Sequence, residues 1–268
     1  MLENNKKVTI YDIINKKSIQ PIVMITAYDA LFAKIFNDYA DIILVGDSLN
    51  MSFGGHSETL GASVEQMIYH ARAVRRGLKR AYMVVDMPFC SCATPELALQ
   101  NCAKVYESTG CDAVKIEGGA HMADTVALLN RNGIAVMSHI GLKPQFSRFT
   151  GGYKVSGRGE EGAREVLNDA RALVEAGAVL LLVEGTICSV ANQVALGTDV
   201  PVIGIGAGVG IDGQVLVWSD MCGFFTEFRP KFVKRYLDGA ELVKGAVREY
   251  AREVKEESFP SEEFEYRQ

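Results

Sequence analysis

Short apolar runs rich in β-favouring residues recur along the chain, and they alternate with stretches in which apolar residues have helical spacing. Continuous apolar runs of this kind are typical of parallel strands that are buried on both faces. We assign strands to eight of them, at residues 21–29, 41–49, 81–89, 111–119, 134–139, 178–184, 200–208 and 214–220. Helices are expected between them, at residues 29–39, 63–79, 94–108, 123–129 and 160–175 and in the residues leading up to Leu196.

Strands that alternate with helices in this way predict an α/β protein, and eight such units predict a (β/α)8 TIM barrel, which needs about 250 residues. The chain has 268 residues. A doubly wound open sheet is the rival fold, but its functional residues would gather at one crevice, whereas here they follow many strands. No linker or shift in composition marks a second domain. We therefore expect residues 1–268 to form one barrel domain, with a short helical arm around residues 10–14 and a polar C-terminal tail.

Charged and polar side chains stand at or near the carboxyl ends of the predicted strands. They are Asp47, Asp86, Lys115, Glu117, His139 and Glu184, and Ser48 follows Asp47 directly. In a barrel these strand ends form one rim, so residues far apart in the sequence converge there. An acidic residue after a strand can instead cap the next helix. For any single residue, helix capping is at least as good an explanation as a functional role, but it explains the whole set poorly.

Two carboxylates that converge at one rim, such as Asp47 and Asp86, repel each other unless a cation joins them. Oxygen ligands completed by water suit Mg²⁺. Lys115 and Glu117 are two residues apart, so the alternation of a strand turns both side chains the same way. A structural ion pair inside the barrel is the alternative for these two. Because a buried lysine is costly, we favour a functional role.

Glu184 follows the apolar run 180–183, a setting that suits a carboxyl group to proton transfer. His139 is more ambiguous, because a histidine with satisfied hydrogen bonds in the core explains it as well as a contact to a ligand. The glycines from Gly208 to Gly213 match the G-x-G-x-x-G pattern of dinucleotide sites, but strand-like residues follow them instead of a helix. We interpret them as a tight turn or a close approach of the backbone to a ligand.

Composition narrows the function classes. The formal net charge of −5 and the lack of a basic stripe argue against nucleic-acid binding. No apolar run reaches membrane-spanning length, and the first twelve residues lack the apolar core of a signal peptide. The 6 cysteines have no framework spacing, which suggests reduced thiols. We expect a cytoplasmic protein with small-molecule substrates.

Several longer stretches are similar to those of a known family, and they occur in the same order along the chain. They are residues 25–29, 45–49, 69–77, 114–119, 139–142, 151–155, 203–208 and 212–217. In these stretches the chain resembles the ketopantoate hydroxymethyltransferase (3-methyl-2-oxobutanoate hydroxymethyltransferase) family, from about residue 22 to residue 248. The resemblance implies a barrel of the phosphoenolpyruvate mutase/isocitrate lyase-like type, a bound Mg²⁺ and assembly into a ring-like homo-oligomer, a decamer.

The resemblance also implies roles for the strand-end residues. Asp47 and Asp86 would hold the metal, with Glu117 assisting through a water molecule. Ser48 and Lys115 would contact the carboxylate and keto oxygen of a branched 2-keto acid, and Glu184 would be the base. Asp47, Asp86 and His139 are also expected to contact this substrate. The one-carbon unit would come from 5,10-methylenetetrahydrofolate, giving 2-dehydropantoate for pantothenate biosynthesis.

The chain departs from the family pattern in loops over the predicted mouth. These departures are Asn50, Ser57, Gly185-Thr186 and Val209-Gly210-Ile211. None replaces a predicted metal ligand or the predicted base, so they bear on the choice of keto acid and on the folate contacts. Two other hypotheses remain: a Mg²⁺-dependent carbon–carbon lyase for another 2-oxo acid that uses no folate, and a non-catalytic barrel.

Overall fold

Eight parallel strands close into a barrel in sequence order, from β1 next to β2 through to β8 next to β1. The computed structural model describes residues 6–226 and 229–267. The strands are β1 (Ile22–Thr26), β2 (Ile42–Val45), β3 (Tyr82–Asp86), β4 (Ala113–Glu117), β5 (Val136–Gly141), β6 (Leu180–Glu184), β7 (Val202–Ile205) and β8 (Gly213–Leu216). The (β/α)8 prediction is confirmed, and the rival open sheet is excluded because β8 pairs with β1.

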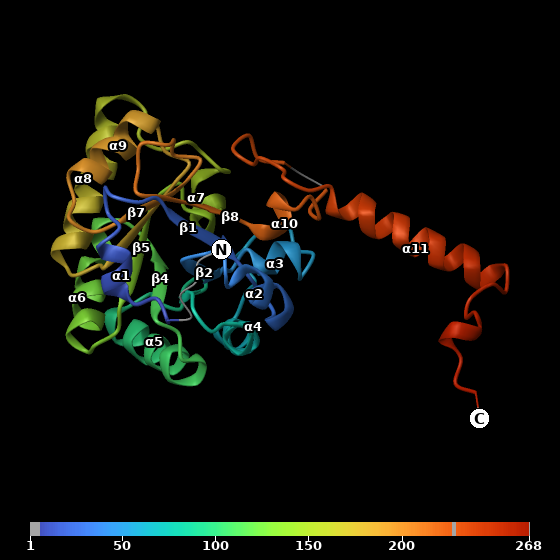
Figure 1. Cartoon of the computed structure of the whole chain (residues 1–268). Coiled ribbons are helices and arrows are strands. Elements are labelled where there is room, and N and C mark those ends of the chain that lie inside the picture. Colours follow the sequence, from blue (N-terminus) through green and yellow to red (C-terminus); the bar gives the residue numbers. More distant parts are fainter. Residues whose placement is uncertain (1–5, 227–228, 268) are drawn as a thin grey trace. The chain divides into compact units, whose positions relative to one another are not determined.

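Helices surround the strands and pack against one another in chain order (Figure 1). They are α2 (Ala30–Phe36), α4 (Val64–Gly77), α5 (Pro95–Thr109), α6 (Ala123–Arg131), α8 (Gly159–Glu175) and α9 (Cys188–Leu196). Shorter helices lie in the connections: α1 (Ile10–Ile14), α3 (Leu49–Ser52), η1 (Ala120–Met122), η2 (Pro144–Phe146) and α7 (Ser147–Thr150).

The sequence explains where three of these helices begin. Asp29 accepts a hydrogen bond from the Phe32 amide at the start of α2. Ser63 and Gln66 form a reciprocal capping box at the start of α4. Thr94 caps α5, whose first position is a proline that has no amide hydrogen to leave unsatisfied. β8 begins at Gly213, so the glycines before it lead into a strand and not into a helix.

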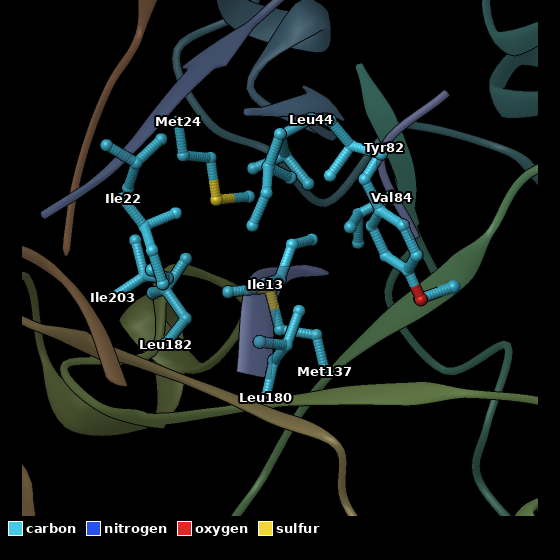
Figure 2. Close-up of a cluster of buried hydrophobic side chains, with 14 of the residues drawn as sticks. Ile13, Ile22, Met24, Leu44, Tyr82, Val84, Met137, Leu180, Leu182 and Ile203 are labelled. Atoms are coloured by element: carbon cyan, nitrogen blue, oxygen red, sulfur yellow. The ribbon is translucent and has the colours of Figure 1, made fainter. Parts of the chain in front are cut away.

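Alternate residues of the strands fill the barrel interior. Pairs two residues apart point inward together, such as Ile22 with Met24 on β1 and Leu180 with Leu182 on β6. The N-terminal arm completes this core: Ile13 is fully buried, and Figure 2 shows its side chain among those from several strands. The arm that the sequence predicts as a helix around residues 10–14 therefore packs into the barrel core.

By its internal contacts the chain divides into two compact units, residues 1–217 and 218–268. The first unit holds the whole barrel. The second contains α10 (Trp218–Met221), α11 (Gly239–Lys255) and η3 (Glu262–Phe264). The assignment of residues 1–268 to a single domain stays a prediction. Among the described residues, no helix is both long and apolar enough to cross a membrane.

The buried position of Ile13 generates a stability prediction. Replacing Ile13 by Ala should lower the free energy of unfolding by about 2–5 kcal/mol, because it removes packed side-chain volume that the barrel cannot refill. Urea unfolding of the full chain measures this. Ile19 is 82% exposed, so Ile19→Ala should stay within about 0.5 kcal/mol and serves as the control. Equal effects of the two substitutions would mean that the arm does not belong to the core.

Candidate active site

The predicted site residues continue the inward-facing register of the apolar core. On β3, Tyr82 and Val84 are core residues and Asp86 is the next residue on the same face. On β6, Leu180 and Leu182 are followed in the same way by Glu184. Lys115 and Glu117 follow Ala113 on β4, and His139 follows Met137 on β5. Strand alternation therefore places these groups inside the carboxyl end of the barrel.

Pairing between neighbouring strands brings opposite charges together. Asp86 lies beside Lys115 in the β3–β4 register, and the Lys115 Nζ is 3.1 Å from Asp86 Oδ1. The other oxygen of Asp86, Oδ2, accepts a hydrogen bond of 3.0 Å from the backbone amide of Asp47, at the end of β2. Both side chains of the ion pair are at most 4% exposed. Lys115 thus compensates a carboxylate at the point where two strand ends meet.

His139 lies between two glutamates. Its Nδ1 is 3.4 Å from Glu117 Oε1, and its Nε2 is 3.4 Å from Glu184 Oε2. Glu117 and His139 are partners in the β4–β5 register, and the Lys115 Nζ is 3.3 Å from the same Nδ1. The histidine is 2% exposed. It therefore links the predicted base to the group around Lys115. Its predicted contact with a ligand stays a prediction.

Burial and crowding shift the pKa values of these groups. Burial, and next the charges of Asp86 and Glu117, raise the pKa of Asp47 well above its usual range. Burial also raises the pKa of Asp86, although Lys115 opposes it. Burial alone would lower the pKa of Lys115, but the carboxylates around it, Asp86 first, raise it. The lysine is therefore a permanent cation at neutral pH.

The pKa values of His139 and Glu117 are balances of opposing effects. Burial and Lys115 lower the pKa of His139, but Glu117 and Glu184 outweigh them and raise it. Burial raises the pKa of Glu117, but His139 and Lys115 outweigh it, and the net direction is down. Each of the two net shifts therefore favours the charged form of its group.

Ser48 is positioned by a residue from the end of another strand. Its Oγ is 2.8 Å from the hydroxyl of Tyr28, which follows β1 and has no exposed surface. The carbonyl oxygen of Tyr28 is in turn 2.7 Å from His70 Nδ1 on α4. Tyr28 belongs to one of the stretches that carry the family resemblance, and it lies two residues after β1 as Asp47 does after β2, but a search for charged residues at strand ends passes over it.

Two further residues come from the connection between β5 and α8. Gln145 is buried in η2, and its side-chain amide donates to Asp47 Oδ2 at 2.9 Å. Tyr153 is about half exposed, and burial, followed by the charge of Glu184, raises the pKa of its hydroxyl. The sequence gives no periodic pattern in this connection, so position relative to a strand could not have identified either residue.

The same connection is joined to the loop after β2. Arg148 on α7 forms a two-pronged ion pair with Glu58, with its Nε 2.9 Å from Oε2. The side chain of Asn50, one of the departures from the family pattern, is buried and donates to the backbone oxygen of Glu58 at 2.8 Å. Both segments follow strands of the barrel, so the pair links two connections at the carboxyl end of the barrel.

All seven predicted site residues therefore lie at one end of the barrel. Hydrogen bonds and close charge contacts join Asp47, Asp86, Lys115, Glu117, His139 and Glu184, and Ser48 adjoins Asp47 in the chain. Their roles as metal ligands, base and substrate contacts stay predictions.

Comparison with known proteins identifies the family. Residues 7–262 match the ketopantoate hydroxymethyltransferase family. A 3-methyl-2-oxobutanoate hydroxymethyltransferase of Campylobacter fetus subsp. fetus is 62% identical over 261 residues, covering 97% of this chain and 99% of the relative. The enzyme of the same name from Campylobacter curvus is 56% identical, and the match covers 100% of both chains. The chain belongs to the ketopantoate hydroxymethyltransferase family.

Solved structures similar to this family member share its fold at low sequence identity. A 2,3-dimethylmalate lyase, described as a PEP mutase/isocitrate lyase superfamily member, has a TM-score of 0.58 at 17% identity and covers 94% of this chain and 88% of its own. A phosphonopyruvate hydrolase crystallised with oxalate and Mg²⁺ has a TM-score of 0.62 at 12% identity, with 94% and 89% covered. The predicted barrel type is confirmed.

The donor set of this ketopantoate hydroxymethyltransferase family member fits a metal that keeps several waters. Within residues 6–226 and 229–267, no group of three or more His, Cys, Asp or Glu side chains is arranged to hold an ion by itself. Asp47 and Asp86 nevertheless adjoin each other, and burial raises the pKa of both carboxyl groups. Mg²⁺ is usually held by one or two carboxylates together with water and substrate oxygens. The pair suits that chemistry.

The raised pKa of Asp47 predicts that this carboxylate destabilises the metal-free protein. A pKa raised in the folded state means that stability is full below the unfolded-state pKa of about 3.9 and is lost as pH rises through the folded-state value. Asp47→Asn cannot ionise, so with EDTA at pH 8 it should melt higher than the unsubstituted protein, by roughly 2–4 °C per kcal/mol relieved. At pH 4 the difference should shrink.

Differential scanning calorimetry at the two pH values measures this effect. Asp199 is exposed, so Asp199→Asn should leave the melting temperature nearly unchanged and is the matched control. A lower melting temperature for Asp47→Asn at pH 8 would contradict the interpretation.

Proposed function

We propose that the protein transfers a hydroxymethyl group from 5,10-methylenetetrahydrofolate to 3-methyl-2-oxobutanoate, giving 2-dehydropantoate (ketopantoate) for pantothenate biosynthesis. The observation that carries this proposal is the convergence of Asp47, Asp86, Lys115 and Glu184 inside the barrel mouth of a chain that belongs to this family. Two carboxylates for a cation, a fixed positive charge and a separate carboxylate are the groups that enolate chemistry on a 2-keto acid requires.

A Mg²⁺ ion held by Asp47 and Asp86, with Glu117 supporting a water, would supply a Lewis acid for the carboxylate and keto oxygens of the substrate. The raised pKa of Lys115 keeps its ammonium group charged, so it stabilises negative charge that develops on the keto oxygen. Ser48, held by Tyr28, donates to the substrate carboxylate. These groups bind and orient the keto acid before any proton moves.

Glu184 removes the proton from C3 of the keto acid. Its side chain is 17% exposed, whereas Glu117 is 2% exposed, so of the two glutamates beside His139 it is the one open to a substrate. His139 Nε2 lies 3.4 Å from Glu184 Oε2, where it orients the carboxylate. Water hydrolyses the methylene group of the folate: both carbon–nitrogen bonds break, tetrahydrofolate leaves, and the carbon is released at the oxidation level of formaldehyde with the oxygen of the water. The C3 carbanion attacks this carbon, and the resulting alkoxide takes up the proton that left C3, which gives the hydroxymethyl group.

The remaining assignments are part of the same proposal. We place the protein in the cytoplasm as a homo-oligomer, a decamer, that binds neither nucleic acid nor membrane. Analytical ultracentrifugation measures the assembly. The similarity to lyase structures is one of fold, so it does not by itself favour the lyase hypothesis. The experiments below distinguish the lyase and the non-catalytic barrel from the proposed transferase.

The direct test of the reaction combines product formation with proton exchange. Protein, Mg²⁺, 3-methyl-2-oxobutanoate and methylenetetrahydrofolate should yield 2-dehydropantoate by mass spectrometry. Without the folate, the protein should exchange deuterium into C3 of the keto acid, and the exchange should require Mg²⁺. Glu184→Gln keeps the size but cannot accept the proton, so exchange should fall by about 10²–10⁴-fold while the keto acid still binds.

Glu175 is exposed at the end of α8, and Glu175→Gln should exchange normally as the control. Undiminished exchange in Glu184→Gln would assign the base elsewhere, with His139 the next candidate. Exchange without product when the folate is present would favour the lyase, and no exchange in any form would favour the non-catalytic barrel.

Metal binding should depend on Asp47 and Asp86 together. Replacing either by Ala should weaken Mg²⁺ binding by more than the roughly 10–100-fold typical of groups that only orient a ligand, because a direct oxygen ligand is lost. Isothermal titration calorimetry measures the affinity, and circular dichroism checks that the barrel persists. Unchanged Mg²⁺ affinity in both variants would remove this assignment.

A further inference from the structure

Gln145 occupies an unusual position for a loop residue. It lies in η2, between β5 and α8, yet only 8% of its surface is exposed. Its groups reach residues at the ends of three other strands: Asp47 after β2, Met87 after β3, and Glu117 on β4. One residue of an irregular connection thus touches two of the three predicted metal-site carboxylates.

In each of these contacts Gln145 donates a hydrogen bond to an oxygen. The side-chain Nε2 donates to Asp47 Oδ2 at 2.9 Å and to the Met87 carbonyl at 3.0 Å. The backbone amide donates to Glu117 Oε2 at 3.0 Å. The Met87 carbonyl can only accept, so the amide has one acceptable orientation. The side chain is therefore locked with both of its hydrogens committed.

These bonds select which atoms of the carboxylates remain available. Asp47 Oδ2 is occupied by the Gln145 amide, which leaves Oδ1 to meet a ligand. Glu117 Oε2 is occupied by the Gln145 backbone, and Glu117 Oε1 faces His139. Gln145 consequently fixes the rotation of one carboxylate and anchors a second through the same short turn.

We propose that Gln145 is a positioning residue of the metal centre, which holds Asp47 so that Oδ1 is presented to Mg²⁺ and ties Glu117 to the same frame. This inference rests on the proposed function, because it needs the metal centre. A neutral amide suits this role, because it supports a buried carboxylate by hydrogen bonding but adds no positive charge that would repel the incoming cation. A lysine or arginine at this position would neutralise Asp47 and compete with the metal.

A purely structural role would predict a different outcome on substitution. If Gln145 only filled the turn, an apolar residue of similar length would preserve Mg²⁺ binding, and only the stability would respond. If it positions Asp47, the Mg²⁺ affinity must fall even where the melting temperature of the metal-free protein does not.

The experiment measures Mg²⁺ affinity by isothermal titration calorimetry and, separately, the melting temperature in EDTA. Gln145→Met should bind Mg²⁺ about 10–100-fold more weakly, the usual effect of removing a group that orients a metal ligand. Gln145→Ser leaves room for a water that can donate to Asp47. Its Mg²⁺ affinity should therefore lie between that of Gln145→Met and that of the unsubstituted protein. It also provides the test if Gln145→Met does not fold.

Asn130 supplies the matched control, because its amide donates at 3.1 Å to the backbone oxygen of Gly177, before β6 and at the opposite end of the barrel. Asn130→Leu should keep the unsubstituted affinity. Equal Mg²⁺ affinity in Gln145→Met and the unsubstituted protein would overturn the role of Gln145 while leaving the metal centre intact. Absence of Mg²⁺ binding in the unsubstituted protein would instead overturn the metal centre itself.

Discussion

Charge buried in an apolar barrel must be compensated, and this requirement organises the structure around the site. Alternating apolar residues fill the barrel interior. Near the carboxyl ends of the strands, ionisable groups continue the same inward-facing register. Lys115 compensates Asp86, and His139 compensates Glu117 and Glu184. Asp47 is held by a neutral amide and has its pKa raised by its surroundings. An added cation would therefore relieve the largest uncompensated cost of buried charge at Asp47.

Strand periodicity explains why so much of this arrangement could be predicted from the sequence. An inward position near a strand end recurs every second residue, so Ala113, Lys115 and Glu117 must share a face once β4 is identified. The same rule places Asp86 and Glu184, and closure of the barrel brings all of them to one rim. The eight strands and the helices between them carry the signal in local patterns, which is why the fold class could be predicted as well.

Gln145 and Tyr153 show where this reasoning ends. Both lie in a glycine-containing connection whose path is set by tertiary contacts, so no period relates their positions to the strands they approach. The N-terminal arm is an intermediate case. The local sequence predicts a helix at residues 10–14, but it does not predict that Ile13 is buried, because that burial depends on packing against the strands of the barrel. Side chains that contact residues far away in the sequence can be identified only from the folded structure.

The bridge between Glu58 and Arg148 differs in kind from the charges below it. Arg148 is largely in water, whereas Lys115 and Asp86 are almost fully enclosed. Rising salt weakens an ion pair that is exposed to solvent, and it acts far less on a buried one. Ionic strength should therefore loosen the entrance loops while the enclosed pairs keep their strength. The exposed ion pair between the loops and the buried ion pair inside the barrel thus respond differently to salt.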